Sequence, residues 1–164
     1  MSNTVSTQNI STAAAHRLIA AGEARAAEIG VPSVIAICDT AGVLKAYTRM
    51  DGAALMCVQV AQDKAYTAAG FGMPSHEWHD FIKDDAPLSA GAPAGVDRLI
   101  VFGGGYPILI DNAVVGGIGV SGGHWSQDMD VAEAALTAIK GEGQNPKSSE
   151  SPKAHACAPP HDRK

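Results

Sequence analysis

The sequence has few basic residues, and those that it has are scattered. Of its 164 residues, 12 are Lys or Arg and 17 are Asp or Glu, which gives a formal net charge of −5. Because binding to a phosphate backbone requires clustered Lys and Arg side chains, this charge distribution argues against nucleic acid as a partner.

Long apolar runs are also absent. No run approaches the roughly 20 residues that a membrane-spanning helix needs. The N-terminal residues MSNTVSTQNI have neither the cationic region nor the apolar core of a secretory signal. We therefore expect a cytoplasmic protein that does not bind membranes.

Cysteine is scarce as well. Cys38, Cys57 and Cys157 are odd in number and far apart, which excludes a disulfide framework and a zinc ribbon. Cys38 and Cys57 are expected to be small core residues. His155 and His161, near Cys157, match no zinc spacing, so we predict no metal site.

The sequence does contain enough apolar residues for one globular domain. Hydrophobic residues make up 46% of the chain and charged residues 18%. We assign residues 1–140 to this domain. Residues 141–164 are rich in Pro, Ser and Lys and have little apolar content, so they cannot bury enough surface to offset their ordering entropy. We therefore predict that residues 141–164 form a flexible polar tail.

Hydrophobic periodicity predicts an α+β sandwich in which helices cover an antiparallel sheet joined by hairpins. Ser75 and Ser126 are placed to cap the third and fourth helices, and residues 84–95, with their Pro and Gly, are expected to form a loop. Residues 96–102 are expected to return to the sheet. The predicted helices cover residues 11–29, 53–69, 76–82 and 127–140, and the predicted strands 33–39, 43–50, 106–110 and 113–120.

Glycines are concentrated in the last predicted hairpin. Glycine weakens a strand, so Gly117 and Gly119 indicate that a ligand or another chain approaches the backbone closely. Together with Gly122 they form the literal pattern G-x-G-x-x-G. The context argues against a dinucleotide site, because one helix and a polar tail follow instead of a βαβ unit with an acidic strand end.

Four histidines are candidate binding residues. His76 and His79 are three residues apart and share one helical face, which suits a haem iron or a metal ion but also an ordinary solvated turn. His16 lies in the first predicted helix. His124 follows the glycine-rich strand at the start of the last helix, where backbone donors favour a carboxylate. A plain turn histidine is the alternative interpretation.

Lys64 lies in an apolar helix, where burial would lower its pKa and make it a candidate base. It could equally pair with an acid or extend its stem to solvent. With His124 and Asp128, Lys64 could surround a substrate and move a proton. No Ser-His-Asp order, nucleophile elbow or phosphate loop is discernible, so the residues leave open whether the protein is an enzyme.

Five segments of the chain together resemble the GlcG/HbpS family, also called the haem-degrading domain family (DUF336). The resemblance covers roughly residues 10–140. It implies a profilin-like sandwich with a five-stranded antiparallel sheet flanked by helices, and homo-oligomers that are often tetramers or octamers. The segments are RMDGA at 49–53, QDKAYTAA at 62–69, GGGYPI at 103–108, VVGGIGVSGG at 114–123 and QDMDVAEAAL at 127–136.

The resemblance also implies a function. Members of the family include a haem-binding sensor, the C-terminal domain of a corrinoid adenosyltransferase, and proteins encoded in catabolic gene clusters. In the sensor a threonine that follows a proline is implicated in haem binding, and this motif corresponds most nearly to Pro74-Ser75 here. His76 is adjacent and could serve as the iron ligand.

We therefore expect an oligomeric protein that binds haem, or another planar or corrinoid cofactor, between subunits. His76 is the best axial candidate, with His79 or His16 behind it, and Ser75, Gly117 and Gly119 are expected beside the ligand. The alternative is an isomerase or tautomerase of small carboxylated or aromatic catabolites, acting through Lys64, His124 and Asp128. A third possibility is that the glycine-rich strand is only a close subunit contact.

Overall fold

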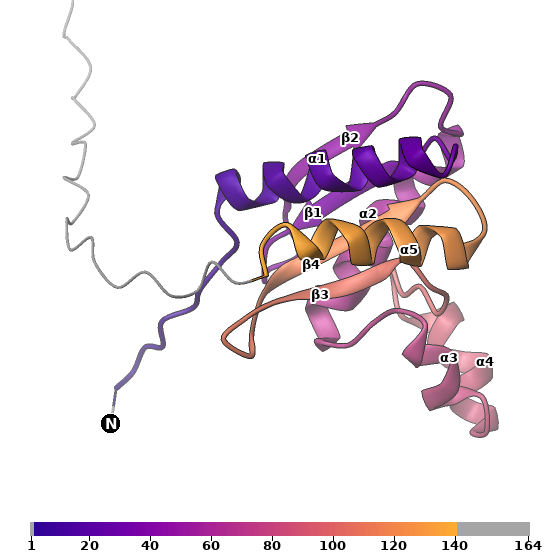
Figure 1. Ribbon diagram of the computed structural model, residues 1–164. Coiled ribbons are helices and arrows are strands. Elements are labelled where there is room, and N and C mark those ends of the chain that lie inside the picture. Colours follow the sequence, from indigo (N-terminus) through magenta and orange to yellow (C-terminus); the bar gives the residue numbers. More distant parts are fainter. Residues whose placement is uncertain (1, 141–164) are drawn as a thin grey trace, which may run out of the picture.

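The computed structural model describes residues 2–140, in which helices cover both faces of one antiparallel sheet (Figure 1). The predicted tail, residues 141–164, lies outside the described residues. No helix in the described part is long and apolar enough to cross a membrane. The helices are α1 (Thr12–Glu28), α2 (Leu55–Phe71), α3 (Glu77–Ile82), α4 (Ala86–Gly95) and α5 (Trp125–Thr137), and the strands are β1 (Val34–Cys38), β2 (Leu44–Arg49), β3 (Gly105–Ile110) and β4 (Ala113–Ser121).

The strand order within the described residues is β2-β1-β4-β3, and every neighbouring pair is antiparallel. The predicted antiparallel sheet with flanking helices is confirmed, but it has four strands instead of five. Residues 96–102 form no strand, because the Thr67 side chain of α2 forms hydrogen bonds with their backbone. The Thr67 hydroxyl donates to the Arg98 carbonyl and accepts from the Ile100 amide, and Arg98 has a left-handed φ of 65°.

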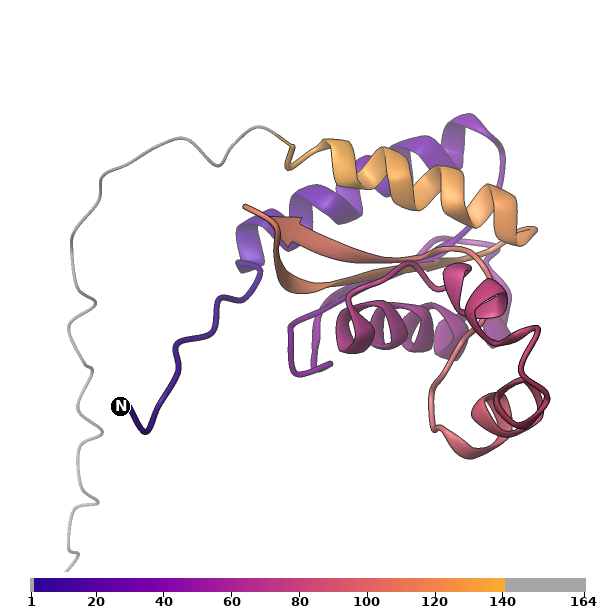
Figure 2. The same ribbon diagram turned by 90° about the horizontal axis from the view of Figure 1, so that it is seen from below.

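The two faces of the sheet carry separate cores, as the alternation of strand side chains requires. On β1, Ile35 and Ile37 pack in the cluster beneath α1 and α5. Val34 and Ala36 pack with α2 on the opposite face. Figure 2 shows this layering, with α1 and α5 on one side of the sheet and α2 on the other.

Helix α2 lies directly on the backbone of β4. A Cβ added at Gly119 would overlap the carbonyl oxygen of Ala61, and one at Gly117 would overlap that of Ala65. The glycines predict a close approach to the strand backbone, and such an approach is present. The group that approaches is helix α2 of the same chain, so the prediction that a ligand or another chain lies beside Gly117 and Gly119 is wrong.

Both helix caps predicted from serines are wrong. Helix α5 begins at Trp125, two residues earlier than predicted, because His124 and not Ser126 is its N-cap. The His124 Nδ1 accepts from the Ser126 amide at 3.3 Å, and the Gln127 side chain accepts from the His124 amide at 3.0 Å, which forms a capping box. His76 occupies the N-cap position of α3, and the hydroxyl of Ser75 is bound elsewhere.

Residues 84–95, predicted to be a loop, contain helix α4. The Asp85 side chain caps it by accepting from the Leu88 amide at 3.0 Å, and Pro87 in the first turn costs no hydrogen bond because the first amides of a helix have no intrahelical acceptor. None of the residues of α4 is buried. Helices α3 and α4 lie together at one end of the sheet (Figure 2).

We expect Gly119→Ala to lower the free energy of unfolding by about 3 kcal/mol, because the new methyl group meets backbone that cannot move aside. Gly70→Ala is the matched control within α2. Its Cβ would have no neighbour within 4 Å, so it should raise stability by about 0.5–1 kcal/mol through helix propensity. Urea denaturation followed by circular dichroism measures both changes. Equal stability of the two variants would contradict the close contact.

Candidate ligand-binding cleft

An open cleft of about 400 Å³ lies where the start of α3, the segment before β3 and the start of α5 meet. Two histidines and two aromatic side chains are among the groups that line it. Phe102 and Trp125 are 42% and 47% exposed, so each presents part of its ring to this space. The lining residues are His76, His79, Asp80, Val101, Phe102, Gly103 and Trp125.

His76 is the least satisfied polar side chain of the cleft. Its Nδ1 is buried and has no hydrogen-bond partner among the described residues. The ring packs at a tilt against Tyr106, with centroids 5.8 Å apart. The Tyr106 hydroxyl donates to Glu133 and makes no hydrogen bond to His76. Burial and this bond raise the pKa of Tyr106. A buried polar atom without a partner often marks a place for a bound group.

His79 and Asp80 lie at the exposed rim of the same cleft. The His79 Nδ1 is 3.6 Å from Asp80 Oδ1. Lys83 donates to the same carboxylate at 2.7 Å and lowers the pKa of Asp80. The His79 side chain is exposed, so it is accessible to a ligand in the cleft that it lines together with His76.

Ser75 is buried behind the cleft and does not line it. Its hydroxyl donates to the Phe102 carbonyl at 2.6 Å and accepts from the Gly105 amide at 3.0 Å. Because both hydrogen bonds go to the backbone, Ser75 fixes the segment that carries Phe102. In this position its hydroxyl is not available to a ligand.

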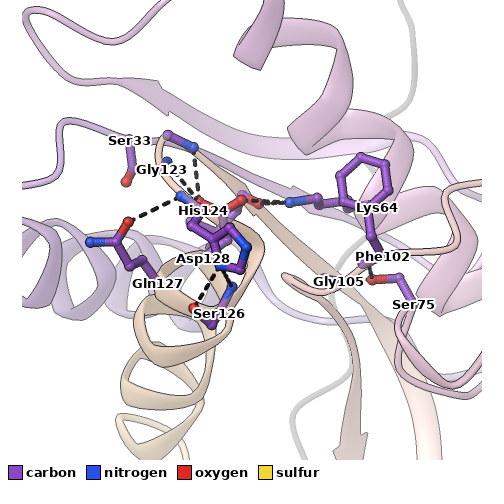
Figure 3. Close-up of polar contacts among 12 residues, drawn as sticks. Ser33, Lys64, Ser75, Phe102, Gly105, Gly123, His124, Ser126, Gln127 and Asp128 are labelled. Carbon is purple, nitrogen blue, oxygen red and sulfur yellow. Dashed lines mark hydrogen bonds and ion pairs between the residues drawn. The ribbon is translucent and has the colours of Figure 1, made fainter.

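Lys64 and Asp128 form a buried ion pair next to the cleft (Figure 3). The Lys64 Nζ donates to Asp128 Oδ2 at 2.7 Å and to the Val120 carbonyl at 2.8 Å. The other carboxylate oxygen accepts from the amides of Gly122 and Gly123. Exposure of the two residues is 0% and 2%. The pair therefore joins α2 to the loop between β4 and α5.

Burial lowers the pKa of Lys64, and the Asp128 carboxylate opposes this shift. The predicted direction of the shift is confirmed. The same burial prevents a substrate in solution from reaching the amine.

The structure thus divides the predicted site residues into separate groups. His76 and His79 share the cleft, and Lys64 and Asp128 share the ion pair. His124 is exposed and caps α5, with its ring centroid 5.0 Å from that of Trp125. Three further residues lie outside the cleft: His16 is exposed on α1, and Gly117 and Gly119 of β4 face α2.

Sequence reasoning missed Phe102 and Trp125. Both are aromatic residues beside candidate segments, since Phe102 precedes the triple glycine and Trp125 follows His124. The chain has only eight aromatic residues of the Phe, Trp and Tyr types, so an aromatic at each end of a glycine-rich segment was a usable signal. No group of three His, Cys, Asp or Glu side chains in residues 2–140 is arranged to hold a metal ion.

We expect Asp128→Ala to lower the free energy of unfolding by about 3–5 kcal/mol, because it leaves a buried ammonium and two amides without their acceptor. Asp130→Ala is the control on the same helix. It breaks an exposed ion pair with Arg25, which should cost less than about 1 kcal/mol. Equilibrium urea unfolding of both variants checks the difference, and a small effect of Asp128→Ala would show that the pair is dispensable.

Comparison with known proteins identifies the family. The chain is 38% identical over 127 residues to the 15.0 kDa protein of the dhaT-dhaS intergenic region of Citrobacter freundii, covering 77% of this chain and 89% of that protein. Among solved structures it is similar to protein ORFY of Klebsiella pneumoniae, with a TM-score of 0.79, 33% identity, and coverage of 84% of this chain and 95% of that one.

A second solved structure contains a ligand. The PduOC:heme complex matches with a TM-score of 0.71 and 34% identity, covering 80% of this chain and 96% of that chain. Residues 10–137 match the family described as haem degrading protein HbpS-like. The chain therefore belongs to the HbpS-like family.

Proposed function

We propose that this protein is an oligomeric haem-binding protein that holds the haem in the cleft beside His76. The observation that carries the proposal is the buried, unpaired Nδ1 of His76 in a cleft with two half-exposed aromatic walls. Ligand sites are mostly apolar and contain a few polar groups that fix orientation. The similarity to the PduOC:heme complex supports the same ligand class.

The residues of the cleft fit the parts of a haem group. An imidazole is a common axial ligand of haem iron, so His76 would supply that nitrogen through Nε2, since its Nδ1 is buried, with His79 as a further candidate. Phe102 and Trp125 would contact the flat apolar macrocycle. When bound, haem supplies a redox-active iron, and the protein contributes the ligand nitrogen, the aromatic contacts and partial exclusion of water.

Exposed apolar side chains on α3 and α4, which contact each other, support an oligomer. Phe81 on α3 is 60% exposed and Leu88 on α4 is 41% exposed. Exposed large apolar groups on neighbouring elements are typical of protein interfaces. A second copy packed against α3 and α4 would cover apolar surface that one protomer leaves in water.

The geometry gives the isomerase or tautomerase alternative no comparable support. A general base must come within hydrogen-bond reach of the proton that it removes. Lys64 and Asp128 are buried and already paired with each other. His124 is committed to capping α5 through its Nδ1.

Titration of purified protein with haemin should shift the Soret band, and His76→Ala should abolish this shift because the axial nitrogen is lost. His16→Ala is the matched control, since His16 is exposed on α1 and does not line the cleft. Absorbance spectroscopy measures both variants, and light scattering of the unmutated protein measures the size of the oligomer.

Two results would contradict the proposal. The absence of a Soret shift at any haemin ratio would remove haem as the ligand. Loss of the shift in His16→Ala with retention in His76→Ala would place haem against α1 instead of in the cleft.

A further inference from the structure

The aromatic walls of the cleft, Phe102 and Trp125, come from different segments, and one buried ion pair lies behind both. Lys64 holds the first wall: its Nζ lies 5.0 Å from the centre of the Phe102 ring. This is a cation–π distance, and such contacts are strongest where water is excluded. Phe102 is therefore in contact with a charge that the protein seals from solvent.

Asp128 holds the second wall. Its Oδ1 accepts from the amides of Gly122 at 2.9 Å and Gly123 at 3.1 Å, and these bonds fix the loop that leads into α5. The Asp128 amide also donates to the His124 carbonyl at 3.1 Å. Trp125 lies within this bonded segment as the first residue of α5, so the carboxylate determines where its backbone sits.

The chain between the walls packs directly on the same pair. A Cβ at Gly104 would lie 2.8 Å from Lys64 Nζ and 2.8 Å from the Asp128 Cβ. A Cβ at Gly103 would lie 3.1 Å from the Trp125 ring. Because interiors are close-packed, a displacement of the pair must displace these neighbours. Figure 3 shows Lys64 beside Phe102 on one side and Asp128 on the other.

We infer that Lys64 and Asp128 are positioning residues whose ion pair sets the separation of Phe102 and Trp125, and with it the affinity of the cleft for a planar ligand. The identity of that ligand rests on the proposed function, whereas the geometry of the walls does not. The competing explanation is a purely stabilising role. Buried ion pairs commonly contribute no more stability than apolar side chains of the same volume, so the two explanations are separated by the position of the aromatic side chains.

The double variant K64M/D128N tests this inference. It removes both charges, while the new asparagine side chain keeps an oxygen that can accept from the amides of Gly122 and Gly123. Its control, R25M/D130N, removes an exposed ion pair that joins α1 to α5, with Arg25 Nη2 2.7 Å from Asp130 Oδ2. We expect K64M/D128N to bind haemin about tenfold more weakly, a typical size for coupling between sites, and to broaden the Soret band. The control should match the unmutated protein.

A second measurement, the fluorescence of Trp125, reports on this side chain's surroundings without haem. The chain has two tryptophans, Trp78 and Trp125, so a W78F background leaves Trp125 as the single tryptophan emitter. In that background K64M/D128N should change the emission maximum and the acrylamide quenching of Trp125. R25M/D130N should change neither.

The outcomes separate the two proposals. Unchanged haemin affinity and unchanged Trp125 emission in folded K64M/D128N would overturn the positioning role and leave haem binding intact. If the unmutated protein binds no haemin, the proposed function fails, and Trp125 emission alone still decides the positioning role. Should the double variant unfold, Asp128→Asn replaces it in both measurements, with Asp130→Asn as its control.

Discussion

The contact of helix α2 with strand β4 through bare backbone determines how the rest of the molecule is arranged. Gly117 and Gly119 have no side chains on this face, so the helix carbonyls approach the strand directly. The helix then lies close enough for Lys64 to reach the Val120 carbonyl near the end of β4 and the Asp128 carboxylate on α5. A strand with larger side chains would hold α2 further away and leave the ammonium without these partners.

This arrangement keeps two kinds of polar group apart. The charges of Lys64 and Asp128 neutralise each other inside the protein, while the imidazoles of His76 and His79 line a space open to solvent. Proton transfer to a substrate requires a reachable acid or base, whereas ligand binding requires shape and a few unsatisfied groups. The division therefore favours binding over acid–base chemistry.

Local signals in the sequence predicted the local structure. The predicted strands 106–110 and 113–120 leave only Asp111-Asn112 between them, which is typical of a tight hairpin, and both residues have the positive φ that such a turn requires. Non-local contacts limited the rest. Nothing near Gly119 in the sequence says that α2 occupies its open side, and nothing near Arg98 says that Thr67 binds its carbonyl. Residues 84–95 form helix α4 instead of the predicted loop, because Asp85 caps the helix and Pro87 lies in its first turn.

The missing hydrogen-bond partner of His76 Nδ1 has a consequence for where the imidazole carries its proton. A neutral imidazole can carry its proton on either nitrogen, and a hydrogen-bonded neighbour normally selects the tautomer. The Tyr106 hydroxyl donates a hydrogen bond to Glu133 and makes none to His76, and Nδ1 of His76 has no donor or acceptor in residues 2–140. The described residues therefore do not select the tautomer of His76, and under the proposed function a ligand in the cleft would select it.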